Sequence, residues 1–199
     1  MRTSCVCFTS VYVVPLFACS LACAATNYVW QGSPPPAPPY GSWSTAAHTI
    51  HDAVDAAVPG DVVYVTNGYY DAGLALVGSA SNRVAVTKPL RLVSVNGAEG
   101  TTIAGGTNIR SLYITEDVDV EGFTITGGYL YTSFGDMAHD AGGNVMCWSG
   151  GVVRSCHVMG GFAWIAGGNV ACYHDGRVEN CRVSGGFTLN SGGGIYCNG

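Results

Sequence analysis

The chain has 199 residues, of which 48% are hydrophobic and only 11% charged, with 29 glycines and a formal net charge of −5. This composition excludes an intrinsically disordered chain, which combines low hydrophobicity with high charge, and the length is sufficient for one domain with a full core. The slight acidic excess gives no basic footprint, so we expect no nucleic-acid partner.

Residues 1–25 have the organisation of an export signal. Arg2 is the single positive charge of the n-region. Residues 11–18 (VYVVPLFA) form an apolar core, and residues 22–25 (ACAA) form a small-residue cleavage region. The apolar stretch is short for a membrane span and contains a proline, which makes an uncleaved anchor the less favoured alternative. We therefore exclude this segment from the fold.

A second alternative concerns lipidation. Residues 16–19 (LFAC) resemble a bacterial lipoprotein box, in which Cys19 would carry the lipid, although phenylalanine fits its second position poorly. In either case we expect a protein that is secreted or associated with the cell surface or outer membrane. Membrane contact is expected only through such a lipid or through a C-terminal anchor.

Residues 26–42 form a proline-rich segment, with a short strand at 28–30 (YVW) and the run PPPAPP at 34–39. Proline lacks a backbone donor, so this run is predicted to be a surface loop rather than a central strand or helix.

Residues 43–59 are predicted to form the helix of this chain. Ser44 is its expected N-cap, and the dipeptide Pro59-Gly60 ends it. Apolar side chains recur at helical spacing at Ala47, Ile50, Val54 and Ala57.

Residues 60–199 contain short strand patterns and no further expected helix. The predicted strands are residues 61–66, 83–86, 90–95, 101–104, 112–115, 118–120 and 123–126, each alternating or wholly apolar. Parallel strands normally need helical crossovers. A chain that coils avoids them, because each strand pairs with its equivalent one turn later.

Residues 141–199 repeat with a period of 25. The runs AGGNVMC, AGGNVAC and SGGGIYC end at Cys147, Cys172 and Cys197 (172 − 147 and 197 − 172), and a second run, around Cys156, returns around Cys181. A fixed period of this size indicates a solenoid. We therefore predict an all-β, parallel β-helix whose first coil is capped by the helix at 43–59.

One irregularity interrupts this period. Residues 123–128 (FTITGG) align with residues 156–161 (CHVMGG) at an offset of 33, eight more than the later period. The extra residues must lie within 129–140, which we predict to be a loop that bulges from a regular coil and the first place to look for function.

The five cysteines of the repeats are predicted to be buried thiols that act as small hydrophobic residues. Stacked side chains on neighbouring parallel strands run parallel, which does not suit the dihedral angle of a relaxed disulfide. No CxxC pair or adjacent histidine has zinc-ligand geometry, so we predict no metal site.

Three stretches together with these repeats carry a family resemblance: residues 49–65, 87–97 and 122–128. They resemble the N-terminal half of bacterial right-handed parallel β-helix proteins of the pectin lyase-like superfamily. The resemblance implies the fold but not one activity, since the superfamily includes lyases, glycoside hydrolases, esterases and adhesins. The chain stops in mid-coil at Asn198-Gly199, so we expect a truncated chain whose missing part holds further coils and any anchor.

Strand alternation predicts which side chains point outward. Trp148 above Tyr173 is expected to form a flat aromatic surface able to stack on sugar rings, with His157 beside it on the next strand, stacked over Arg182. The favoured function is therefore an exported, non-catalytic, adhesin-like protein that binds polysaccharides or cell-surface glycans and needs no cofactor.

The alternative is a polysaccharide lyase or glycoside hydrolase whose catalytic coils are partly missing; calcium would be a cofactor only in the lyase case. The catalytic candidates are His139 and Asp140 in the insertion. Against them, the acids are scattered and hydrolase motifs with paired acids are missing. Glu121, Arg154 and Glu179 are predicted to form an outward column of alternating charge with a structural role.

Overall fold

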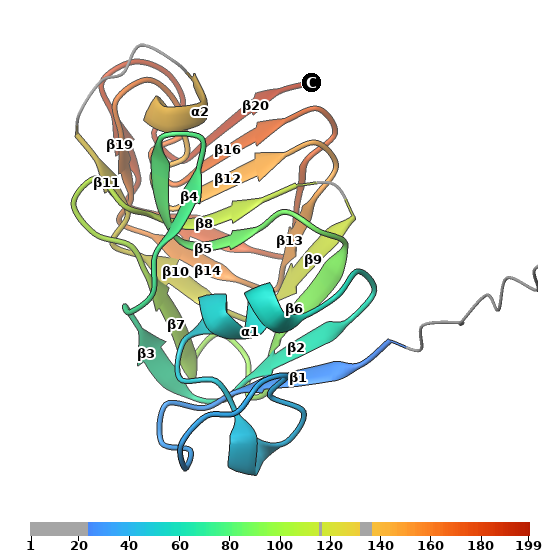
Figure 1. Cartoon of the computed structure of the whole chain (residues 1–199). Helices are drawn as coiled ribbons and strands as arrows, with labels where there is room; N and C mark the ends of the chain where they lie inside the picture. The colour runs from blue at the N-terminus through green and yellow to red at the C-terminus, as the bar shows by residue number, and fades with distance from the viewer. Residues whose placement is uncertain (1–23, 116, 132–136) are drawn as a thin grey trace, which may run out of the picture.

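The computed structural model describes residues 24–115, 117–131 and 137–199, so nearly all of the predicted export signal, including Cys19, lies outside the described residues. The described chain is mostly β-structure with parallel sheets (Figure 1), which confirms the all-β prediction. Among these residues, no helix has the length and apolar character needed to cross a bilayer.

Most strands belong to three long sheets. The first sheet contains β1 (Thr26–Val29), β2 (Val62–Val65), β6 (Leu90–Ser94), β9 (Val118–Glu121), β13 (Val152–Arg154) and β17 (Arg177–Glu179). The second contains β3 (Gly68–Tyr70), β7 (Thr101–Ala104), β10 (Thr124–Thr126), β14 (His157–Met159) and β18 (Arg182–Ser184). All neighbouring strands of these two sheets are parallel.

The third sheet contains β4 (Ala75–Val77), β5 (Ala80–Val86), β8 (Arg110–Ile114), β12 (Val145–Trp148), β16 (Val170–Tyr173) and β20 (Ile195–Asn198). Its strands are parallel except for the antiparallel hairpin β4–β5. A small fourth sheet joins β11 (Tyr129–Leu130), β15 (Phe162–Ala163) and β19 (Phe187–Thr188). Successive strands of each sheet therefore come from successive units of the chain.

The strand register confirms both predicted offsets. Cys147 is paired with Cys172, and Cys172 with Cys197, at the 25-residue period. Thr124 is paired with His157, which is the predicted offset of 33. The extra residues lie between β11 and Ala141, which bridges Ala166. They include the four-residue helix α2 (Met137–Asp140), so the prediction of no second helix was wrong; one turn is too short to leave a periodic pattern.

The N-terminal helix is shorter than predicted. A 3-10 helix, η1 (Trp43–Thr45), precedes α1 (Ile50–Ala56), and the N-cap of α1 is Thr49, whose hydroxyl accepts a bond from the Asp52 amide. The continuous helix from Ser44 fails because Ala47 is held by β1: it donates to the Tyr28 carbonyl and accepts from the Trp30 amide.

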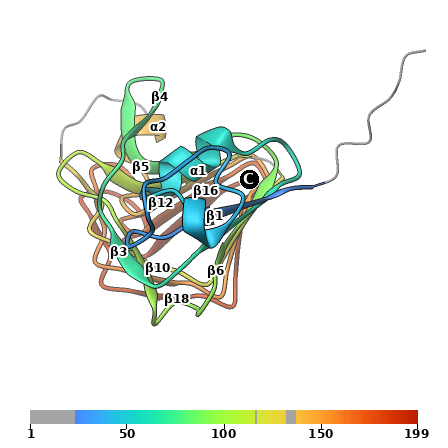
Figure 2. The same ribbon diagram turned by 60° about the horizontal axis from the view of Figure 1, so that its bottom comes forward.

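The main core lies between the sheets. It consists of stacked columns of Val, Leu, Ile and Cys side chains, and α1 contributes Ile50, Ala53 and Val54 at the N-terminal end. Figure 2 shows α1 and β1 in front of the later strands when this end is turned toward the viewer. Burial of each such aliphatic side chain stabilises the fold by roughly 1.5–3 kcal/mol.

The repeated glycine pairs fulfil a backbone requirement. Gly142 and Gly167 have φ values of 64° and 60°, where other residues are strained, and a Cβ on Gly167 would lie 2.2 Å from the Val170 carbonyl oxygen. The turn before β12 and β16 can therefore be built only with glycine at these positions.

Candidate functional site

The predicted aromatic pair lies on the outer face of the third sheet. Trp148 and Tyr173 are register partners, and their ring centroids are 5.1 Å apart with an interplanar angle of 34°. However, Tyr173 is only 5% exposed, and Met146 and Ala171 on the same face are fully buried. The prediction of a flat exposed surface here was therefore wrong.

The physical reason is a second apolar cluster outside the main core. Ala75 and Val77 of the β4–β5 hairpin pack with the outward side chains of the third sheet. Figure 1 shows this hairpin and α2 standing over that sheet. Outward alternation gives the direction of a side chain but does not reveal what covers it.

The third predicted binding residue, His157, lies on the second sheet rather than beside the aromatic pair. It is the register partner of Arg182, as predicted, and its Nδ1 lies 3.5 Å from a carboxylate oxygen of Glu99. The structure therefore does not bring Trp148, Tyr173 and His157 onto the same sheet.

The catalytic candidates His139 and Asp140 lie in α2. The His139 Nε2 atom is hydrogen-bonded to the hydroxyl of Ser79 at the tip of the β4–β5 hairpin. Asp140 is fully buried. A carboxylate without solvent access cannot contact a polysaccharide in this arrangement, so His139 and Asp140 have the environment of residues that hold the insertion in place.

Sequence reasoning missed the buried cation that anchors the insertion. Arg110 of β8 is fully buried and donates hydrogen bonds to the Asn82 side chain and to the carbonyls of His139, Ala141 and Gly142. Buried charges are tolerated when their donors are satisfied in this way. Only the register, which puts β8 beside the end of the insertion, makes this role visible.

Opposite charges meet on the outer face of the first sheet. Arg154 pairs with Asp119 at 2.8 Å and with Glu179 at 3.9 Å. Arg91 contacts both Asp119 and Glu121, at 3.6 and 3.2 Å. The predicted column of alternating charge is therefore confirmed in register. No group of three or more His, Cys, Asp or Glu side chains in the described chain is placed to hold a metal ion.

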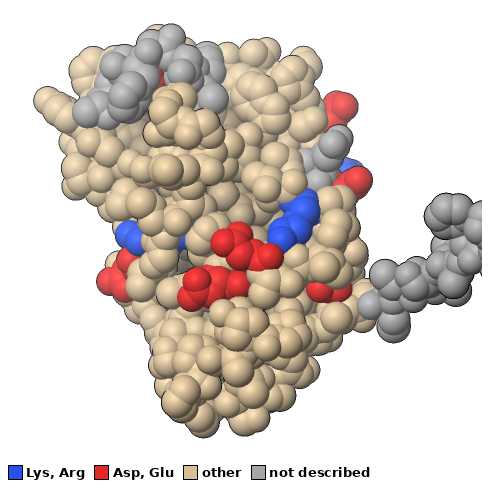
Figure 3. Space-filling view, viewed as in Figure 1, with Lys and Arg blue, Asp and Glu red and all other residues tan. Residues whose placement is uncertain are grey.

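The most exposed aromatic side chains beside the insertion lie on the fourth sheet or immediately after its first strand. We define the aromatic surface as Tyr129, Tyr131, Phe162, Trp164 and Phe187. Tyr129, Tyr131 and Phe187 are 43%, 58% and 58% exposed, whereas Phe162, which lies between Tyr129 and Phe187, is buried. Figure 3 shows most of the visible charged side chains in a band across the middle of the molecule. Contiguous exposed apolar groups of this kind mark interaction sites.

Strand pairing sets the order of these rings. Tyr129 is paired with Phe162, and Phe162 with Phe187, so their rings stack at 4.6 and 5.8 Å. Tyr131 continues the row, 6.1 Å from Tyr129 and only 11° from parallel, and the edge of Trp164 meets it. Tyr129 of β11 and Tyr131, the first residue after this strand, therefore extend the aromatic row of the later repeat units.

Polar groups lie at the borders of the aromatic surface. The Asn108 side-chain oxygen accepts a bond from the Tyr131 amide and fixes the backbone there. Asn190 and Ser191, both exposed, follow β19 at the opposite border. Flat rings bordered by amides and hydroxyls match a sugar, which has an apolar face and hydroxyls at its edge.

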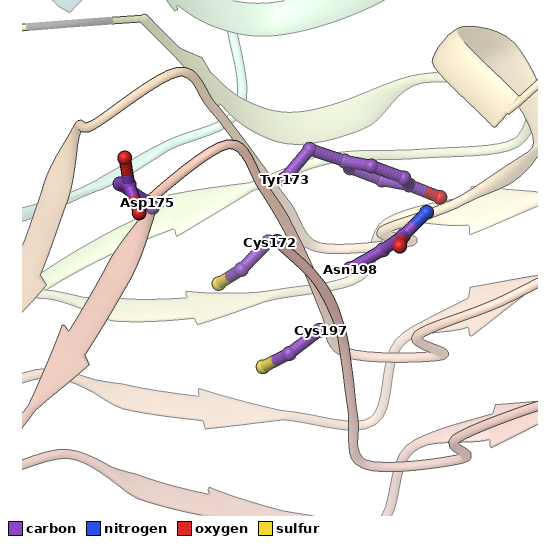
Figure 4. Close-up of a pocket in the computed structure, with 7 residues that line it drawn as sticks. Cys172, Tyr173, Asp175, Cys197 and Asn198 are labelled. Atoms are coloured by element: carbon purple, nitrogen blue, oxygen red, sulfur yellow. The ribbon is translucent and has the colours of Figure 1, made fainter.

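A small pocket lies at the end of the third sheet, beside Cys172, Tyr173, Cys197 and Asn198 (Figure 4). The two thiols point to the same side, whereas the Tyr173 and Asn198 side chains point to the other. Its volume of about 110 Å³ is well below the roughly 300–1,000 Å³ of typical ligand pockets. It is therefore too small for a sugar.

Comparison with known proteins identifies no relative: no family model, no curated protein and no solved structure matches the chain.

Proposed function

We propose that the chain is part of an exported parallel β-helix of the pectin lyase-like kind and that it binds glycans through the aromatic surface, without catalysis. The parallel registers at offsets of 25 and 33 support the fold. The observation that carries the binding function is the exposed row formed by Tyr129, Tyr131 and Phe187.

The binding energy expected of this row is moderate. An aromatic ring that covers one face of a sugar removes apolar area from water on both partners, and each ring contributes roughly 1 kcal/mol. Two or three rings along one polysaccharide chain contribute roughly 2–3 kcal/mol, or about 30–150-fold in affinity. Such surfaces bind long chains better than single sugars, because several rings act together.

The test is retention of the protein on soluble xylan, mixed-linkage β-glucan, polygalacturonate and alginate in affinity gels. The wild type is expected to be retarded by at least one of these polymers. Tyr131→Ala and Phe187→Ala should reduce that retardation, whereas Tyr69→Ala should not, because Tyr69 is 56% exposed but lies on β3 of another sheet. Equal migration of wild type and variants in every gel contradicts the proposal.

A uronate lyase is the second candidate, because the carboxylates of Asp119 and Glu121 meet Arg91 and Arg154 on one face. A lyase needs a base that removes a proton from the substrate. The hydrogen bond from Arg154 to Asp119, together with the charge of Asp119, raises the pKa of Arg154 above its usual range. The guanidinium therefore stays protonated, which makes it a poor base.

Incubation of the protein with polygalacturonate and alginate, with and without calcium, distinguishes the two functions. Formation of unsaturated uronate products that is lost in Asp119→Asn supports the lyase. Binding without product supports the proposed glycan-binding role.

A further inference from the structure

Ala25 lies immediately before β1. Its carbonyl accepts a hydrogen bond from the Val62 amide at 3.0 Å, which adds it to the edge of the β1–β2 pairing. Its own amide nitrogen lies 2.7 Å from the Oδ1 atom of Asp61. Ala24 and Ala25 are both exposed. The peptide bond between them is therefore accessible, and Ala25 on its C-terminal side is held by hydrogen bonds to Val62 and Asp61.

Asp61 is an unusual acceptor, because it is only 3% exposed. Its second oxygen accepts from the Val58 amide at 2.8 Å. Lys88, a nearby cation, instead donates its ammonium group to the carbonyls of Asp55 and Ala57. A buried carboxylate is costly unless it is paired with a cation, and two neutral donors meet that need only in part.

We propose that a signal peptidase cleaves the chain between Ala24 and Ala25 and that the new ammonium group of Ala25 forms an ion pair with the buried carboxylate of Asp61. The inference rests on the export proposed above. The sequence Ala22-Cys23-Ala24 supplies the small-residue cleavage pattern immediately before this bond.

The chemistry is hydrolysis of one amide. Water adds its hydroxyl to the Ala24 carbonyl, the C–N bond breaks, and the nitrogen of Ala25 takes up protons to become an ammonium at neutral pH. That nitrogen is already 2.7 Å from Asp61, which is the length of a charge-assisted bond, so the new terminus needs no movement to form it.

The position of the bond is specified to one residue. A strand advances about 3.3 Å per residue, so a chain that began at Ala24 would carry its charge beyond hydrogen-bond distance of Asp61. A chain that began at Thr26 would lose the donor altogether. The fold therefore discriminates among cleavage positions that the alanine-rich sequence alone leaves open.

The first test is expression of the full chain in a secreting bacterium, followed by N-terminal sequencing and intact mass measurement of the exported product. A single terminus at Ala25 is expected. A product that begins at Ala24 or Thr26, or that retains Met1, overturns the proposal. Polysaccharide retardation of the same sample is measured separately, so that failure of glycan binding and failure of this inference are distinguished.

The second test compares chains that a site-specific protease releases with Ala24, Ala25 or Thr26 as the first residue. The Ala25 form is expected to have the highest melting temperature. Asp61→Ala should abolish the difference between the Ala24 and Ala25 forms. Equal melting temperatures of these two forms with Asp61 present contradict the ion pair, and this comparison does not depend on whether Asp61→Ala folds.

Discussion

The side-chain amide of Asn144 donates a hydrogen bond of 2.8 Å to the side-chain oxygen of Asn169, one repeat later. Both residues are fully buried. The Asn169 oxygen also accepts from the Gly161 amide, and its nitrogen donates to the Ser184 carbonyl. Each asparagine therefore satisfies backbone groups at a corner where the chain leaves one sheet and enters another.

Asn169→Ala is expected to lower the free energy of unfolding by roughly 3 kcal/mol, because it leaves the Gly161 amide, the Ser184 carbonyl and the Asn144 side chain without these partners in a buried site. Urea denaturation followed by circular dichroism measures this change. Asn190→Ala, on an exposed turn, is the matched control and should change stability by less than about 0.5 kcal/mol. Equal effects of the two substitutions contradict the role of Asn169.

A glycine pair offers a matched test of close backbone packing. A Cβ on Gly168 would lie 2.3 Å from the Phe187 carbonyl oxygen, whereas a Cβ on Gly194 would meet no atom closer than 4.0 Å. Gly168→Ala is expected to cost roughly 3 kcal/mol through overpacking, and Gly194→Ala almost nothing. The urea midpoints of the two variants measure the difference, and similar midpoints refute it.

Thiol alkylation is predicted to follow pKa rather than exposure. A hydrogen bond from Cys156 lowers the pKa of Cys181 to about 7, whereas burial and Cys172 raise that of Cys197. Because the thiolate is the reactive form, Cys181 should react first with iodoacetamide near pH 7, although Cys197 is more exposed. Raising the pH should increase the alkylation rate of Cys197 more than that of Cys181.

Peptide mass spectrometry after short labelling times measures the extent of alkylation at each of the five cysteines of the repeats. The buried Cys147, Cys156 and Cys172 should be labelled only after unfolding, which serves as the internal control. Labelling of Cys197 before Cys181 at pH 7 is the opposite outcome.

Arg110→Met is expected to destabilise the fold by roughly 3 kcal/mol, because the carbonyls of His139, Ala141 and Gly142 lose a buried charged donor. Thermal unfolding checks this. Arg182→Met, on the exposed face of β18, removes the same charge and should be nearly neutral. If both variants unfold at the same temperature, Arg110 does not anchor the insertion.

Much of the fold could be predicted from the strand pattern, because the local alternation of apolar residues agrees with the pairing of the strands in the structure. Each alternating run became a strand within a few residues, and the offsets of 25 and 33 fixed the register. The helix start was misplaced because Ser44 and Thr49 are both good caps, and only the pairing of Ala47 with β1 decides between them.

The candidate site was predicted less well, because whether an outward side chain is covered depends on segments that are far away in the sequence. The β4–β5 hairpin buries the face that carries Tyr173, and no pattern within the repeats reveals this. The insertion was correctly placed from the broken period, but its contribution to the aromatic row depends on Tyr129 stacking on Phe162 across an offset of 33 residues. Register and aromatic content together could have indicated this row.

The most direct test of the glycan-binding account is the dissociation constant of Tyr129→Ala/Tyr131→Ala for the polysaccharide that retards the wild type most strongly. The account predicts a dissociation constant at least roughly tenfold larger than that of the wild type, with an unchanged circular dichroism spectrum. The control variant Tyr69→Ala should bind as tightly as the wild type. A double variant that is folded and binds as tightly as the wild type would contradict it.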